Sequence, residues 1–147
     1  MGGEIFKTLI LKQVIDNIIN DFAHISCWEE KYEYLIELGH NLKPLHNNLK
    51  TDHHLIHGCQ SKVWLVCKYE DEKLHFYGDS DALITKGLVA LIVKVYSGCQ
   101  AEELLKENGQ VFSTIGLQKH LSMNRANGLN IMIKTVQNYG LKYIKNG

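Results

Sequence analysis

The sequence predicts the α+β fold class, with a small antiparallel β-sheet of about three strands packed against helices. Three observations support this prediction. Apolar residues recur at helical spacing up to residue 39, β-branched and aromatic residues dominate 62–78, and helical spacing returns from residue 82. Helices, a small antiparallel sheet and further helices, in that order, are typical of an α+β domain. We therefore expect residues 1–147 to form a single domain.

Two helices are expected before the sheet. Residues 5–22 have the apolar spacing of an amphipathic helix. Its apolar face is expected to contain Ile5, Phe6, Leu9, Val14, Ile15, Ile18, Ile19 and Phe22. Ser26, with Glu29 three residues later, matches a capping box and predicts a second helix over 27–39. A polar loop that contains the only proline of the chain follows over 40–54.

The predicted sheet is built around a hairpin. Residues 62–69 are β-branched and aromatic, residues 70–73 are polar, and residues 74–78 alternate between apolar and polar side chains. This order of strand, turn and strand predicts a β-hairpin over 62–78. Residues 54–57 are expected to add a third, shorter strand.

Helices are expected to follow the sheet. Residues 82–96 are almost continuously apolar, which indicates a helix buried against the sheet and ending just before Gly98. Asp79, Ser80 and Asp81 supply candidate capping side chains for its beginning. A short helix is expected over 101–107. Ser122 is expected to cap a last helix over 123–138, whose predicted buried face is Ala126, Leu129, Ile133 and Val136.

Composition restricts the classes of function. Sixteen Lys and Arg balance sixteen Asp and Glu, so no net charge attracts the chain to nucleic acid or to an anionic membrane. No apolar run approaches the roughly 20 residues that span a bilayer, and the first residues lack the pattern of a signal peptide. The four cysteines are therefore expected as thiols in a reducing cytoplasm. No two of them form a C-x-x-C motif, which argues against a zinc ribbon and against a thioredoxin-type redox site.

Cys59 is the leading candidate for chemistry. It lies in the turn sequence His57, Gly58, Cys59, Gln60, Ser61, directly before the predicted hairpin. Gly58 permits backbone angles that let the chain turn sharply, and a thiol on a loop at the end of a sheet can react with a partner. The thiolate is the nucleophile, and His57 or turn N–H groups would favour it. Spacing alone nevertheless favours a small buried thiol, the usual fate of a lone cysteine.

The sequence around Cys59 resembles a known signature. Residues 58–64 (GCQSKVW) closely resemble the signature of SufE-like sulfur acceptors, which accept sulfur from cysteine desulfurases. Three further segments resemble parts of this family in the family's order, namely 28–32 (WEEKY), 78–82 (GDSDA) with 86–88 (KGL), and 120–122 (HLS) with Arg125 and 127–129 (NGL). The chain departs from the usual family pattern at His54, Lys62 and Met123.

The resemblance implies a fold and a function. The fold would be an antiparallel sheet flanked by helices, shared with IscU-type cluster scaffolds. Cys59 would accept sulfane sulfur as a persulfide from a PLP-dependent cysteine desulfurase (SufS-like), stimulate that enzyme, and pass the sulfur on for iron–sulfur cluster assembly on a SufBCD-like scaffold. Such a carrier is not itself an enzyme and needs no cofactor or metal. Its loop and partner-facing residues would be His57, Gly58, Gln60, Ser61, Asp81, His120 and Arg125.

Three other functions remain open from the residues. A metal site would use His53, His54, His57 and Cys59, although their spacing fits no established zinc motif. A hydrolase would use Cys59 as nucleophile, His120 as base and Asp81 to orient it. An iron–sulfur scaffold would need several converging cysteines.

The other three cysteines have ordinary contexts. Cys67 lies in the middle of a predicted strand and is expected in the core. Cys27, at a helix start, and Cys99, after a helix-ending glycine, are expected to be half exposed.

Overall fold

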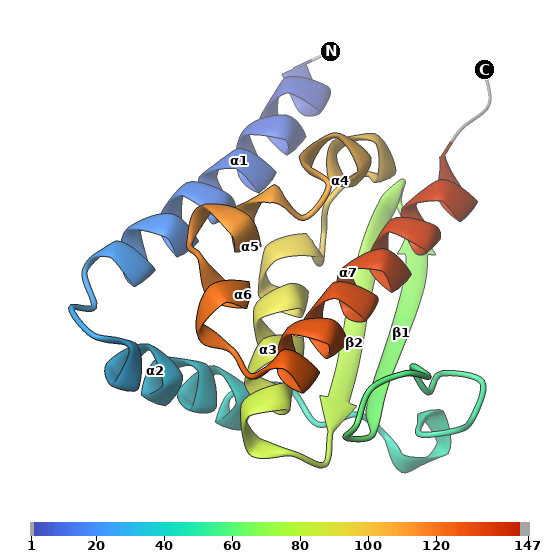
Figure 1. Cartoon of the computed structure of the whole chain (residues 1–147). Coiled ribbons are helices and arrows are strands. Elements are labelled where there is room, and N and C mark those ends of the chain that lie inside the picture. Colours follow the sequence, from blue (N-terminus) through green and yellow to red (C-terminus); the bar gives the residue numbers. More distant parts are fainter. Residues whose placement is uncertain (1, 145–147) are drawn as a thin grey trace.

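The fold is that of a computed structural model, which describes the backbone of residues 2–144 and the side chains of residues 11–144. Figure 1 shows α7 lying along the β-hairpin, with α3 beside it and α1 and α2 on the other side of α3. The helices are α1 (Gly2–Ala23), α2 (Trp28–His40), the 3-10 turn η1 (Asn47–Leu49), α3 (Leu83–Tyr96), α4 (Ala101–Glu107), α5 (Gln110–Thr114), α6 (Leu117–His120) and α7 (Met123–Tyr143). The strands are β1 (Val63–Glu70) and β2 (Lys73–Ser80). The predicted α+β class is confirmed.

The hairpin is antiparallel and in the predicted place. Val63 pairs with Ser80 at one end, and Glu70 pairs with Lys73 at the other. The two residues of the tight turn, Asp71 and Glu72, both have positive φ angles, as the favoured two-residue hairpin turn requires.

The prediction of a third strand over 54–57 is wrong in detail. Within residues 2–144 the sheet has two strands, and the segment contributes one isolated bridge, Leu55 to Trp64. Two hydrogen bonds accompany it, from Ile56 N to Val63 O (2.8 Å) and from Leu65 N to His54 O (3.0 Å). The segment stays extended too briefly to form a ladder, because the chain turns at 51–54 and again at Gly58.

The core is built around α3. Its side chains Leu88, Val89, Leu91, Ile92, Val95 and Tyr96 are buried. A Cβ on Gly87 would lie 2.3 Å from Leu35 O, so the close packing of α2 against α3 depends on this glycine. From α1, Ile18 and Phe22 are buried as predicted, whereas the side chains of Ile5, Phe6 and Leu9 lie outside the described residues.

Two of the predicted helix caps are wrong. The N-cap of α2 is Cys27 and makes no side-chain capping bond, because the helix begins at Trp28 and leaves Ser26 outside the capping position. The N-cap of α3 is Ala82, since β2 extends through the expected caps as far as Ser80. Ser122 caps α7 as predicted, its hydroxyl accepting a hydrogen bond from Arg125 N (3.3 Å).

The C-terminal half is more helical than predicted. The short helix over 101–107 is confirmed as α4, but α5 and α6 were not predicted, and α7 continues to Tyr143 rather than ending near residue 138. Asn108, Gly109 and Gly116 have positive φ angles and separate these short helices. The Glu107 carboxylate accepts hydrogen bonds from Gly109 N (2.8 Å), Val111 N (2.7 Å) and Tyr96 OH. Among the helices described, none is long and apolar enough to cross a membrane.

Candidate functional site

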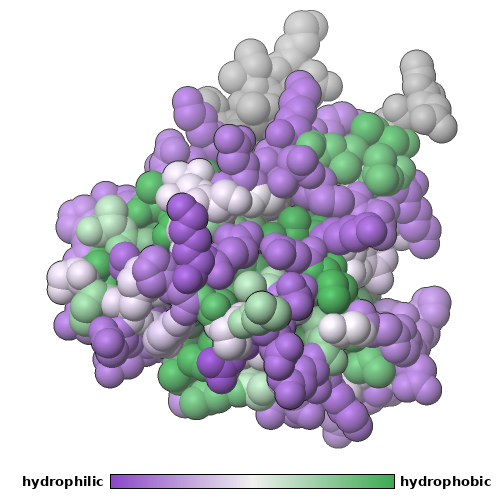
Figure 2. Space-filling view, viewed as in Figure 1, coloured by the Kyte–Doolittle hydropathy of each residue, from purple (hydrophilic) through white to green (hydrophobic). Residues whose placement is uncertain are grey.

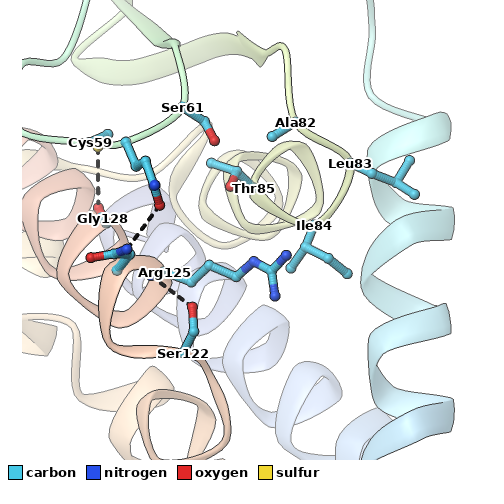
Figure 3. A pocket seen from close by; sticks show the side chains of 11 residues that line it. Cys59, Ser61, Ala82, Leu83, Ile84, Thr85, Ser122, Arg125 and Gly128 are labelled. Carbon is cyan, nitrogen blue, oxygen red and sulfur yellow. Dashed lines mark hydrogen bonds between the residues drawn. The ribbon is translucent and has the colours of Figure 1, made fainter.

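A cavity of about 510 Å³ lies at the end of the sheet where β1 begins and β2 ends. Three segments that are distant in sequence enclose it: the turn at 59–61, the beginning of α3 at 82–85, and the beginning of α7 at 122–128. Figure 3 shows their side chains around the cavity. The lining residues are Cys59, Gln60, Ser61, Ala82, Leu83, Ile84, Thr85, Ser122, Asn124, Arg125 and Gly128.

The turn that carries Cys59 begins at a glycine with a positive φ angle and is hydrogen-bonded at its other end. Gly58 has a φ angle of +97°, and a Cβ at this position would approach Ile131 Cδ1 to 2.9 Å. At the other end Lys62 N donates to Asp81 Oδ1 (3.0 Å), and Lys62 O accepts from Ser80 Oγ (2.8 Å). The structure therefore gives Asp81 and Ser80 a different role from the predicted helix cap, because they attach the turn to the end of β2.

Cys59 is half buried against α7. Its Sγ lies 3.9 Å from the carbonyl oxygen of Gly128, to which the thiol donates a weak hydrogen bond (Figure 3). A Cβ on Gly128 would lie 3.6 Å from Sγ, so this glycine leaves space beside the sulfur. Burial raises the pKa of Cys59 above its ordinary value of 9.0. Burial therefore favours the thiol over the thiolate at rest, and exposure of the sulfur to water would favour the thiolate.

A second pair of side chains joins the turn to α7. Asn124 Nδ2 donates a hydrogen bond to Gln60 Oε1 at 2.9 Å, and both side chains are exposed. The turn therefore rests on α7 through Cys59 and Gln60 together. Gln60 and Ser61 line the cavity as the sequence predicted, but Asn124 was missed. Its one sequence signal was its position directly before Arg125, in the first turn of the last helix.

Arg125 is the only charged residue among the described lining residues. In Figure 3 its side chain extends along the cavity toward Ile84, away from Cys59. Its backbone N–H donates a hydrogen bond to Ser122 Oγ. Within residues 11–144, its guanidinium makes no hydrogen bond or ion pair. Burial, rather than a nearby charge, sets the direction of the Cys59 pKa shift, so Arg125 does not favour the thiolate at rest.

The two predicted histidines do not line the cavity. His57 is exposed beside the turn. His120 stacks on Trp28, with ring centroids 3.8 Å apart and planes 13° apart, and its Nδ1 lies 3.1 Å from Gly116 O. His120 thus packs on Trp28, and Asp81 accepts a hydrogen bond from Lys62 N. These residues do not form the Cys–His–Asp triad of the hydrolase hypothesis.

The metal hypothesis gains no support from the geometry. Among residues 11–144, no group of three or more His, Cys, Asp or Glu side chains is arranged to hold a metal ion. His54 instead places its Nδ1 3.0 Å from Leu49 O, and its ring meets the His53 ring edge-on at 5.0 Å.

The other cysteines differ from Cys59. Cys99 is only 5% exposed, which corrects the expectation of a half-exposed thiol, because its segment pairs with β2 and closes over the core. Cys67 is half buried and packs against the core rather than lying fully within it. Burial raises the pKa of Cys67 to about 11 and that of Cys99 to about 12. Cys27 is half buried, as expected.

A buried carboxylate beside the site, paired with two partly exposed lysines, was also missed. Asp79 is 6% exposed and pairs with Lys50 (2.9 Å) and Lys86 (3.4 Å). Burial acts to raise the pKa of Asp79, but the hydrogen bonds from Lys50 and Ser80 N and the charge of Lys86 lower it overall. The pair ties the loop before β1 and the first turns of α3 to the end of β2.

The cavity has an apolar rim. Leu83 is 56% exposed and Met123 is 80% exposed, and they lie at the beginnings of α3 and α7. Figure 2 shows apolar surface at the lower edge of the molecule, around the region where these helices begin. Leu83 and Met123 are therefore exposed apolar side chains beside the cavity.

Comparisons with known proteins identify the family of the chain. A family model described as "SufE: Fe-S metabolism associated domain" matches residues 16–140. An uncharacterised SufE-like protein of Rhizobium meliloti (strain 1021) is 43% identical, over 84% of this chain and 91% of the relative. An uncharacterised SufE-like protein of Rhizobium etli is 41% identical, over 84% of this chain and 86% of the relative.

A solved structure shares the fold. The solution structure of a hypothetical protein from Thermus thermophilus is similar, with a TM-score of 0.74 over 88% of this chain and 95% of that chain. At 18% identity this likeness concerns the fold alone. The family match covers both the Cys59 turn and the two helix beginnings that enclose the cavity, and the chain therefore belongs to the SufE family, which is associated with iron–sulfur metabolism.

Proposed function

We propose that this chain is a sulfur acceptor and carrier, in which Cys59 takes sulfane sulfur from a PLP-dependent cysteine desulfurase and holds it as a persulfide. The observation that carries the proposal is the position of Cys59. All four cysteines are described, and Cys59 alone among them lines the cavity. The sulfur then passes to an iron–sulfur assembly scaffold, in keeping with the family's association with iron–sulfur metabolism.

The transfer step is an exchange between sulfur atoms. The Cys59 thiolate attacks the terminal sulfur of the desulfurase persulfide, a new S–S bond forms at Sγ, and the desulfurase cysteine leaves as a thiolate. The reaction needs no external oxidant. The cavity of about 510 Å³ gives the added sulfur a sheltered position away from solvent thiols.

Docking of the desulfurase is proposed to release the turn. At rest, burial raises the pKa of Cys59, which lowers the fraction of thiolate and slows its reaction. Two contacts with α7 hold it there, Cys59 to Gly128 O and Gln60 to Asn124. Outward rotation about Gly58 breaks both, while the bonds of Lys62 to β2 and Asp81 keep the end of the turn in place. Exposure to water and to the partner then favours the thiolate.

The docking surface is proposed to surround the cavity. Leu83 and Met123 supply exposed apolar contacts, and Arg125 supplies a charge that has no ion-pair partner among residues 11–144. The partner-facing residues proposed from the sequence are Arg125 together with His57, Gly58, Gln60, Ser61, Asp81 and His120. The carrier works as a thiol protein in a reducing compartment, the cytoplasm, and brings no cofactor of its own.

Stimulation of a desulfurase tests the proposal. The wild-type chain should raise the turnover of a cognate desulfurase, because a docked thiolate removes the persulfide faster than free thiols do. Without the desulfurase it should release no sulfide from cysteine. Cys59→Ser should still bind the desulfurase, since the docking surface is unchanged, but should not stimulate it. Full stimulation by Cys59→Ser would instead indicate an allosteric activator and would rule out the carrier mechanism.

A further inference from the structure

The cavity is larger than the proposed cargo requires. One added sulfur atom needs space on the order of the 30 Å³ that a water molecule occupies in the liquid, whereas the cavity has about 510 Å³. Ligand sites for small molecules have roughly 300–1,000 Å³. The space beside Cys59 is therefore large enough for a small molecule.

The lining of the cavity indicates the chemistry of that molecule. Cys59 lies at one end, and the Arg125 guanidinium extends along the cavity toward Ile84, away from the sulfur (Figure 3). The described lining includes no acidic side chain that could pair with the guanidinium. A guanidinium binds carboxylates through two parallel hydrogen bonds. The hydroxyls of Ser61 and Thr85, which also line the cavity, add polar groups between the two ends.

We propose that the cavity also admits a free hydropersulfide that carries a carboxylate, of the cysteine persulfide class, with Arg125 holding the carboxylate while Cys59 takes the sulfur. This inference rests on the proposed function of Cys59 as a sulfur acceptor. It adds a route by which the chain is loaded without a protein donor.

The step balances without a further reactant. The Cys59 thiolate attacks the terminal sulfur of R–S–SH, the Sγ–S bond forms, and the S–S bond to R breaks. The leaving group is the thiolate R–S⁻, which takes up the proton that Cys59 loses when it ionises. The net reaction converts Cys59–SH and R–S–SH into Cys59–S–SH and R–SH, so sulfane sulfur is transferred with no net oxidation.

A matched pair of donors tests the inference. Cysteine hydropersulfide and cysteinamide hydropersulfide differ in one carboxylate, and the rate at which each loads Cys59 is followed by peptide mass spectrometry without reductant. In the wild-type chain the carboxylate donor should load Cys59 about tenfold faster, the size expected for one charge-assisted, bidentate contact. Cys27, half buried and outside the cavity lining, should show no such preference in the same sample.

Two variants complete the test. Arg125→Gln should reduce the preference at Cys59 to within about twofold, because the guanidinium is removed from an exposed position without disturbing the core. Lys134→Gln removes an exposed cation of the same helix that does not line the cavity, and should keep the tenfold preference.

Loading of Cys59 by a desulfurase distinguishes a failure of this inference from a failure of the proposed carrier function. If the desulfurase loads Cys59 but the carboxylate gives no preference, or Arg125→Gln keeps the preference, the inference is overturned and the carrier function stands. If neither the desulfurase nor either small donor loads Cys59, the carrier function itself is wrong.

Discussion

Residues 58–60 and residues 98–100 have the same sequence, Gly-Cys-Gln, and each begins with a glycine of positive φ, +97° and +93°. They lie at opposite ends of the hairpin. Cys59 precedes the end where Val63 pairs with Ser80, whereas Cys99 bridges to Leu74, near the hairpin turn. Cys59 is half buried on a cavity, and Cys99 is 5% exposed in the core.

The difference between the two thiols comes from what each segment contacts. Gly98 N donates to Leu74 O (2.6 Å) and Leu74 N donates to Cys99 O (2.8 Å), so the second segment is paired as an extension of the sheet. The first segment rests on α7 by a weak thiol contact and one exposed amide pair. The same tripeptide thus has a core role in one place and a candidate reactive role in the other, and tertiary contacts alone separate them.

The largest expected contrast is in reactivity. With iodoacetamide at pH 8, Cys59 should be alkylated more than about a hundredfold faster than Cys99. With a pKa of about 12, only about one Cys99 in ten thousand is a thiolate at that pH, and its surroundings also exclude the reagent. The rate at Cys59 should keep rising past pH 9, because its pKa lies above 9.0. Peptide mass spectrometry measures both sites in one sample. Comparable alkylation rates at Cys59 and Cys99 would contradict the prediction.

The next contrast is in stability. Cys99→Ser should lower the free energy of unfolding by about 2 kcal/mol, because it places a hydroxyl in an apolar site without an assured partner. Cys59→Ser should change it by less than about 0.5 kcal/mol, since the side chain is half exposed. Urea denaturation of the two variants measures the difference. An equal cost at both positions would mean that Cys59 is a core residue as well.

A matched pair of glycines sharpens the comparison. Gly58→Ala and Gly98→Ala should each cost about 1 kcal/mol, because both positions require a φ that L-residues rarely adopt. Only the Cβ at position 58 meets a neighbour, Ile131 Cδ1 at 2.9 Å, whereas nothing lies within 4 Å at position 98. Gly58→Ala should therefore also slow sulfur loading of Cys59, and Gly98→Ala should not. Equal loading rates in the two variants would show that the backbone at Gly58 does not position the thiol.

The smallest effect is expected from the ion pair beside the Cys59 end. The pKa of Asp79 is lowered in the folded chain, so its stabilisation is complete above the ordinary value of 3.8 and is lost as pH falls through the lowered value. The Asp79→Asn variant should therefore lose less stability than the wild-type chain as the pH falls below about 4. Thermal unfolding at a series of pH values measures this slope. An unchanged slope would mean that Asp79 does not contribute to acid sensitivity.

Local pattern was sufficient for the main elements. Three predictions that depend only on neighbouring residues were confirmed. They are the burial of Ile18 and Phe22 on the first helix, the β-hairpin, and the cap at Ser122. The predicted caps of α2 and α3 failed because propensity alone does not decide where a helix begins. The third strand failed because two turns leave residues 54–57 extended too briefly.

Contacts between distant residues were beyond the sequence. The pairs Cys59–Gly128 and Gln60–Asn124 join residues more than sixty positions apart, and the buried pairing of Asp79 joins three separate segments. Residue type alone did not reveal that Cys99 is buried. The turn sequence and the resemblance to the SufE family together pointed to Cys59, and the resemblance alone pointed to Arg125. Only the structure shows that both line one cavity.

The most direct test of the central claim is the location of transferred sulfur. The wild-type chain is incubated with a cognate desulfurase and cysteine, then digested and mapped by mass spectrometry without reductant. The account predicts a gain of one sulfur, about 32 mass units, on the peptide that contains Cys59, reversible by added thiol. It predicts none on the peptide that contains Cys99. Sulfur found mainly on Cys27, Cys67 or Cys99, or full loading that persists in folded Cys59→Ser, would contradict it.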